Sequence, residues 1–140
     1  MAITHDKLSC DLKELFELSV EAAIGLIEKD SSLLPFMFKQ TSTSKVHIVF
    51  TDEHSTKHAI SQALKTTLHD ITTLRFVLTY PGIIKSEDGE RINAIILEGS
   101  EKGADAGFIF AQRYQQDEEG GYTWITGDTF LRATTRLRIH

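Results

Sequence analysis

The chain has 140 residues, of which 41% are hydrophobic and 25% are charged. A chain of this length and content can bury one hydrophobic core, which excludes disorder and low complexity as descriptions of the whole chain. Acidic residues outnumber basic ones by 20 to 15, giving a net charge of -5, and this excess opposes attraction to phosphate backbones or anionic lipid. We therefore expect no nucleic acid and no membrane among the partners.

A cytoplasmic location is expected from the cysteine content and the N-terminal residues. Cys10 is the one cysteine and cannot form an internal disulfide, which fits a reducing compartment. Its neighbours are acidic, whereas a nucleophilic thiol needs a base or positive surroundings, so we expect a small helix residue there. The chain start lacks the basic and apolar regions of a secretory signal, and no stretch approaches the ~20 apolar residues of a membrane-spanning helix.

The first half of the chain shows helical and strand patterns in turn. Over residues 6–29 apolar positions recur at three- and four-residue steps, which predicts a helix with Asp6 as its N-cap. The apolar stripe is broad, so this helix either lies deep in a groove or meets another protein with its second stripe. Segments 33–39 and 46–50 are predicted to form a hairpin, and residues 52–69 a second amphipathic helix.

From residue 72 the apolar period changes to two, which is typical of strands. The predicted strands are 72–80, 91–98, 105–116 and 122–126. Pro81-Gly82 is expected to bend the chain or to end regular pairing, and Gly99 to Gly103 is expected to form a turn. Glycines in the acidic segments 87–90 and 117–121 predict two further turns. The segment from 130 to 140 is basic and forms either an extra strand or a loose tail.

These elements predict a single α+β domain over residues 1–140. Short turns between consecutive strands require antiparallel pairing. The expected architecture is two-layer, with two helices packed on a mainly antiparallel sheet of five to six strands, in the order α-β-β-α-β-β-β-β. Strands 91–98 and 105–116 are apolar on both faces, and two helices on one face leave the other uncovered. A curled sheet, the C-terminal segment or a partner must then cover it.

The most specific polar pattern consists of Arg91, Glu98, Arg113 and Tyr114. Arginine can hold a carboxylate or phosphate with two parallel hydrogen bonds. Arg91, Arg113 and Tyr114 are therefore the candidate contacts for an anionic small molecule. The alternative, which we favour, is a cross-strand ion pair with Glu98 or with an acidic turn residue.

Two histidines, His54 and His58, have the four-residue spacing of metal ligands on one helix face. Ser55 stands where a zinc-protease helix carries its glutamate, and His69 continues the same polar face. We expect a solvated face and no metal site. The sequence contains no phosphate-binding glycine loop that would indicate a cofactor. It also contains no glycine-flanked serine that would indicate a nucleophile.

The sequence favours a non-enzymatic protein-binding module of an adaptor or chaperone-like kind, with a protein partner or as a homodimer. In size, acidic charge and element content the chain is similar to the secretion chaperones, which are small, dimeric α+β proteins. This resemblance implies a class of function and assigns no residue a role. The alternative is a small enzyme or ligand-binding protein that recognises an anionic small molecule on the sheet face.

Overall fold

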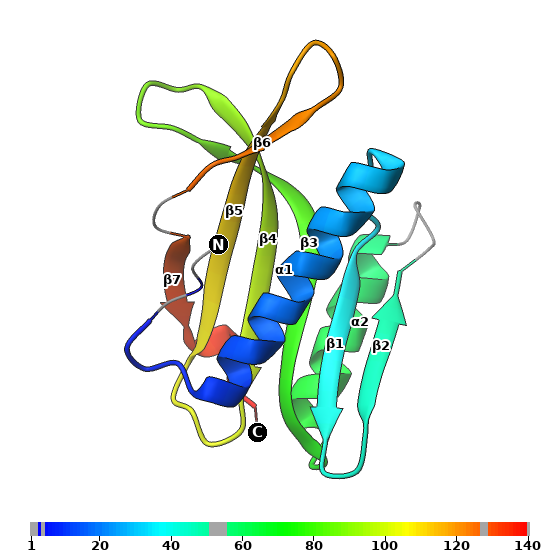
Figure 1. Ribbon diagram of the computed structural model, residues 1–140. Helices are drawn as coiled ribbons and strands as arrows, with labels where there is room; N and C mark the ends of the chain where they lie inside the picture. The colour runs from blue at the N-terminus through cyan, green and yellow to red at the C-terminus, as the bar shows by residue number, and fades with distance from the viewer. Residues whose placement is uncertain (1–2, 4, 51–55, 127–128, 140) are drawn as a thin grey trace.

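The structure is a computed structural model that describes residues 3, 5–50, 56–126 and 129–139. Two helices, α1 (Cys10–Asp30) and α2 (Thr56–His69), pack on one seven-stranded sheet (Figure 1). Its strands are β1 (Phe36–Thr41), β2 (Lys45–Val49), β3 (Thr73–Lys85), β4 (Arg91–Glu101), β5 (Gly107–Gln116), β6 (Tyr122–Trp124) and β7 (Phe130–Thr134), and a 3-10 turn, η1 (Thr135–Leu137), follows. The strand order is β2-β1-β3-β4-β5-β6, and β7 also pairs with β5.

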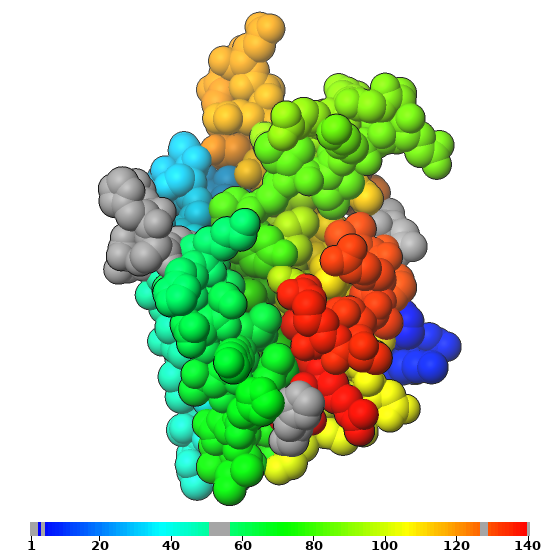
Figure 2. Space-filling view, turned by 180° about the vertical axis from the view of Figure 1, so that it is seen from behind, coloured from blue at the N-terminus to red at the C-terminus, as the bar shows by residue number. Residues whose placement is uncertain are grey.

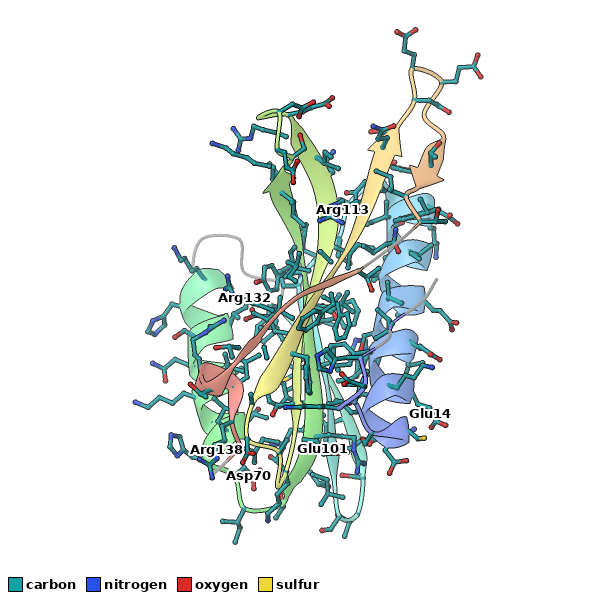
Figure 3. The ribbon with its side chains drawn as sticks, turned by 90° about the vertical axis from the view of Figure 1, so that its left-hand side faces the viewer. Glu14, Asp70, Glu101, Arg113, Arg132 and Arg138 are labelled. Atoms are coloured by element: carbon teal, nitrogen blue, oxygen red, sulfur yellow. The ribbon has the colours of Figure 1, made fainter. Side chains whose placement is uncertain are left out.

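The predicted α+β class, with two helices on an antiparallel sheet, is confirmed. The layering differs from the expected two layers, because α1 and α2 lie on opposite faces of the sheet (Figure 3). Strand β3 shows the arrangement directly: Val77 packs in the core under α1, whereas Phe76 and Leu78 pack in the core under α2. Strand residues alternate between faces, so a strand that is apolar on both sides is buried on both sides.

Helix α1 begins later than its apolar pattern suggests. The N-cap is Ser9, whose hydroxyl accepts a hydrogen bond from the backbone N–H of Leu12 at 3.1 Å. Asp6, the expected cap, lies in the turn before the helix. The helix ends at Ser31, which adopts a left-handed conformation with φ of 59°. The expected start of the second helix, residues 52–55, lies outside the described residues.

The central strands run longer than expected. β3 continues through Pro81–Gly82 in its pairing with β4, because β1 reaches no farther than Thr79 and leaves the side of β3 to which the proline nitrogen points without a strand. β4 continues through Gly99, where a Cβ atom would lie 2.6 Å from the Phe16 ring, so only glycine allows α1 to approach this closely. Two long hairpins therefore project beyond the helices (Figure 1).

Helix α2 and the C-terminal segment together cover the second face of the sheet (Figure 2). Leu137 is fully buried and Ile139 is 6% exposed, and both pack in the cluster that contains Ile109 and Ala111 of β5. The segment from residue 130 therefore forms strand β7 and the η1 turn. The sequence left a curled sheet, the C-terminal segment or a partner as alternatives for covering the second apolar face. In the structure the C-terminal segment packs on that face beside α2.

Candidate functional site

The three candidate ligand contacts do not converge on one face of the sheet. Arg113 and Tyr114 are neighbours on β5, so their side chains point to opposite faces. Tyr114 packs on the α1 side, and Arg113 pairs with Ala94, which belongs to the core under α2. Arg91 is exposed near the tip of the β3–β4 hairpin and shares the face of Tyr114, because it is two residues from Tyr114's partner Asn93. Figure 3 labels Arg113.

Tyr114 belongs to an aromatic cluster that joins the end of α1 to β5 and β6. Its ring centroid lies 5.1 Å from that of Trp124 and 6.0 Å from that of Tyr122. The indole N–H of Trp124 donates a hydrogen bond to Glu28 on α1 at 2.9 Å. Burial, followed by the neighbouring Tyr122, raises the pKa of the Tyr114 hydroxyl. These rings pack against the hydrophobic core under α1.

Glu98 is a buried carboxylate on the α2 side, 5% exposed. It accepts hydrogen bonds from the hydroxyl of Tyr80 at 2.8 Å and from the guanidinium of Arg136. Burial and the negative charge of Glu98 raise the pKa of Tyr80 well above its ordinary value. The carboxylate thus holds the C-terminal turn against the sheet. The sequence carries no local signal of this pairing, because Arg136 lies in the C-terminal segment and no regular spacing links it to Glu98.

An open apolar surface lies between α1 and the edge strand β2. Helix α1 packs over β3 and β4, and β1 and β2 emerge beyond it (Figure 1). We call this surface the α1–β2 trough. It is formed by Leu26 and Asp30 of α1, Ser32 and Leu34 in the following loop, Phe36 of β1, and His47 and Val49 of β2.

The wall of the trough follows from helix geometry. Leu18, Ala22 and Leu26 recur every four residues and therefore form one stripe along α1. Leu26 lines a cavity of about 210 Å³ whose other lining residues include Phe36 and Val49. Leu26 consequently faces β1 and β2, and Ala22 and Leu18 continue its stripe toward the N-terminus of α1.

The floor of the trough follows from strand alternation. Phe38 and His47 are directly paired across β1 and β2, and Phe38 packs against the core under α1. Their rings stack with centroids 4.5 Å apart and an interplanar angle of 21°. Val49, two residues from His47, points to the same side. An aromatic and aliphatic floor therefore lies beside the apolar wall.

Large hydrophobic side chains are concentrated on this side of the molecule. Eight are exposed among the described residues, and four of these lie on α1, the loop after it and the α1 side of β2. The four, exposed by 38–47%, are Leu18, Leu26, Leu34 and Val49, whereas Val46 of β2 points to the other face of the sheet. Contiguous exposed apolar surface on a folded domain commonly marks a site of contact with another molecule.

Strand β2 adds an unpaired backbone to this apolar surface. It stands first in the strand order and pairs only with β1 among the described strands. The N–H of Phe50 donates to the carbonyl of Pro35, so alternate residues counted back from Phe50 direct their backbone groups at β1. The N–H and C=O groups of Lys45, His47 and Val49 consequently point away from the sheet.

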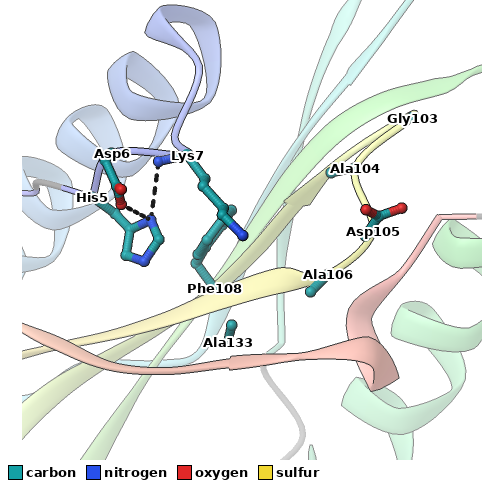
Figure 4. Close-up of a pocket in the computed structure, with 9 residues that line it drawn as sticks. All are labelled: His5, Asp6, Lys7, Gly103, Ala104, Asp105, Ala106, Phe108 and Ala133. Carbon is teal, nitrogen blue, oxygen red and sulfur yellow. Dashed lines mark hydrogen bonds and ion pairs between the residues drawn. The ribbon is translucent and has the colours of Figure 1, made fainter.

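A second pocket, of about 480 Å³, lies between the N-terminal segment and the β4–β5 turn (Figure 4). Its polar lining includes His5, Asp6, Lys7 and Asp105. The His5 ring packs against Phe108 and Phe130 with centroids 4.9 and 4.6 Å away, which fixes it at the rim. The pocket presents both signs of charge within a small space.

The described residues contain no group of three or more histidine, cysteine, aspartate and glutamate side chains placed to hold a metal ion. His58 is exposed on α2, and His54 lies outside the described residues. Neither helix in the described part of the chain combines the length and the apolar character needed to cross a membrane.

Comparison of the chain with protein-family models, with curated proteins and with solved structures finds no match. The choice of site consequently depends on the geometry of this chain. The α1–β2 trough combines exposed apolar side chains with backbone groups of β2 that no described strand pairs, and it is the candidate site.

Proposed function

We propose that the protein is a non-enzymatic protein-binding module, of the adaptor or chaperone-like kind, and that it binds its partner in the α1–β2 trough. The observation that carries the proposal is the coincidence of an apolar trough with the unpaired edge of β2. An extended segment of a partner that pairs with β2 would exchange backbone hydrogen bonds with Lys45, His47 and Val49. Its alternate side chains would enter the trough between β2 and Leu26.

The apolar side chains would supply the binding energy. Burying an exposed leucine or valine completely contributes roughly 1.5–3 kcal/mol. Leu26, Leu34 and Val49 are 38–47% exposed in the free chain, so part of that energy is still available to a partner. The backbone bonds along β2 would fix the register of the bound segment, because strand pairing places alternate side chains on opposite faces.

The charged side chains that form ion pairs or hydrogen bonds with one another hold parts of the fold together. Arg75 contacts Glu101 at 3.0 Å, and Lys39 contacts Asp70 at 2.9 Å. Glu98 is held by Tyr80 and Arg136. Each of these pairs joins separate elements of the fold, and none of these residues lines the trough.

The test is a quantitative capture experiment with matched lysine substitutions. Val49→Lys and Leu26→Lys each place a charge in the trough, whereas Ile83→Lys places one at a 53% exposed position on the β3–β4 hairpin. All three positions are exposed, so stability should change by only about 0.5 kcal/mol. We expect a partner that is retained by wild type and Ile83→Lys and lost from both trough variants. Equal retention of every protein by all four chains would contradict the proposal.

A second candidate function is the binding of a small polar molecule, and the observation that favours it is the pocket beside His5. Its lining contains Lys7 together with Asp6 and Asp105, so an anion alone is not the ligand that its charges select. A thermal-shift panel of metabolites tests this candidate, with His5→Ala as the pocket variant. A ligand that stabilises wild type and not His5→Ala would support it, and no shift across the panel would contradict it.

A further inference from the structure

We infer that the occupant of the β2 edge is a second copy of this chain, paired antiparallel to the first about a two-fold axis at His47. The inference rests on the proposed function and adds the identity of the partner. Three features of the described residues lead to it: the backbone pattern of β2, the opposite charges of Lys45 on β2 and Asp30 on α1, and the form of the other sheet edges.

The outward backbone groups of β2 are complementary to themselves. Lys45, His47 and Val49 are evenly spaced, and each directs one N–H and one C=O away from β1. When two copies pair antiparallel with His47 opposite His47 of the partner subunit, Lys45 falls opposite the partner's Val49. Every outward donor of Lys45, His47 and Val49 then meets an outward acceptor. A register shifted by one residue would instead oppose groups that already bond to β1.

The same register brings opposite charges together. Lys45 and Val49 point to the α1 side of the sheet, so the lysine of one copy extends over the valine of the other. Val49 and Asp30 line the same cavity, so in this register the lysine of one copy would extend toward the cavity that contains the carboxylate of Asp30. By symmetry the contact occurs twice.

Asp30 and Lys45 lack this kind of contact within one copy. Among the described residues neither side chain takes part in an ion pair. Asp30 is moreover the last residue of α1, where the helix dipole disfavours a negative charge. A lysine delivered by a second copy would offset that unfavourable position.

The other sheet edges are less suited to pairing. β6 has three residues, and β7 is displaced by a register shift between Ile109 and Phe110 of its partner β5. Short strands and bulges are devices that discourage edge-to-edge pairing. β2 pairs with β1 in unbroken register over its five residues and contains no proline.

Cysteine cross-linking tests the register directly. In a Cys10→Ser background, the only thiol of a His47→Cys variant would lie on the two-fold axis, with Cα atoms about 5.5 Å apart and within disulfide range. Val46→Cys is the matched control, because its Cα atoms would be roughly 8 Å apart, too far for a disulfide. Under mild oxidation we expect on the order of tenfold more disulfide-linked dimer from His47→Cys than from Val46→Cys. Equal yields would overturn the inference.

Charge reversal supplies an independent measurement by sedimentation equilibrium. Wild type at about 50 µM should be dimeric, as expected for a dissociation constant in the low micromolar range. Asp30→Lys and Lys45→Glu should each weaken association on the order of tenfold, and the double variant should recover most of the loss. A monomeric wild type, or a double variant as weak as the singles, would overturn the inference.

These results separate this inference from the proposed function. A monomeric wild type that still loses a captured partner on Val49→Lys substitution would overturn the self-pairing and leave the protein-binding role in place. A monomer that shows no trough-dependent partner would overturn both.

Discussion

The hydroxyl of Tyr80 on β3 donates a hydrogen bond of 2.8 Å to the carboxylate of Glu98 on the neighbouring strand β4. Arg136 of the η1 turn reaches the same carboxylate, so one buried acid joins two central strands to the C-terminal segment. Because that segment covers the sheet beside α2, the pairing helps to close the face that the sequence left without a cover.

Removal of this carboxylate should destabilise the fold. Glu98→Ala leaves the half-buried hydroxyl of Tyr80 without an acceptor and releases Arg136, and we expect a loss of about 2 kcal/mol in the free energy of unfolding. Glu14→Ala makes the same chemical change at an exposed position on α1 (Figure 3) and should change stability by less than about 0.5 kcal/mol. Urea unfolding of both variants measures the difference, and equal stabilities would contradict the structural role of Glu98.

The raised pKa of Tyr80 predicts a loss of stability in alkaline solution. Tyrosine in an unfolded chain ionises near pH 10. The folded state holds its proton to higher pH, so the unfolded state binds fewer protons above about pH 10 and stability falls as pH rises. Tyr80→Phe should lose about 1 kcal/mol at neutral pH and show a shallower decline between about pH 9 and 11. An unchanged slope would show that Tyr80 does not titrate in this way.

Gly107 should not tolerate a side chain, because the C-terminal segment packs against its backbone. A Cβ atom at this position would lie 2.5 Å from Leu137, which is fully buried. We expect Gly107→Ala to cost about 1–3 kcal/mol by displacing the tail. Gly25→Ala is the control: nothing lies within 4 Å of its added Cβ, and alanine in a helix should stabilise by roughly 0.5–1 kcal/mol. Thermal unfolding of the two variants should therefore shift in opposite directions.

The ion pair between Lys39 and Asp70 predicts sensitivity to acid. A hydrogen bond from the Lys39 ammonium group, with others from Thr72, holds the pKa of Asp70 well below its usual range. This stability is present above the unfolded pKa near 4 and is lost as pH falls through the lower folded pKa. Asp70→Asn should therefore lower the urea midpoint at pH 7 and leave it nearly unchanged at the acid end of the profile. Parallel profiles for wild type and variant would contradict this account.

Local patterns were sufficient to predict the class of the fold and most of its strands. The opposite orientation of Phe108 and Ile109 follows from strand alternation, and the structure places them in the two separate cores. Alternation shows that a strand has two apolar faces, but it carries no information on which helix covers each. The separation of α1 and α2 therefore had to come from the tertiary arrangement. The N-cap at Ser9 likewise depends on one hydrogen bond, which the Leu12 N–H donates to the Ser9 hydroxyl oxygen.

Part of the candidate site could be predicted from the sequence. The broad apolar stripe of the first helix predicted either a helix deep in a groove or a second contact surface, and one residue of the stripe, Leu26, lines the trough. The opposite orientation of Arg113 and Tyr114 could also have been read from strand alternation. The bond between Glu98 and Arg136 joins residues 38 positions apart, and no local pattern predicts such a contact.

Hydrogen exchange at the backbone amide of His47 tests the interface role of the β2 edge most directly. The Ile48 amide is an internal reference, because it points to β1 and should exchange at a rate independent of protein concentration. Between about 2 and 200 µM wild-type protein, exchange at His47 should slow on the order of tenfold as the edge becomes paired. Equally fast exchange of the His47 amide at both concentrations would contradict pairing of this edge between copies of the chain.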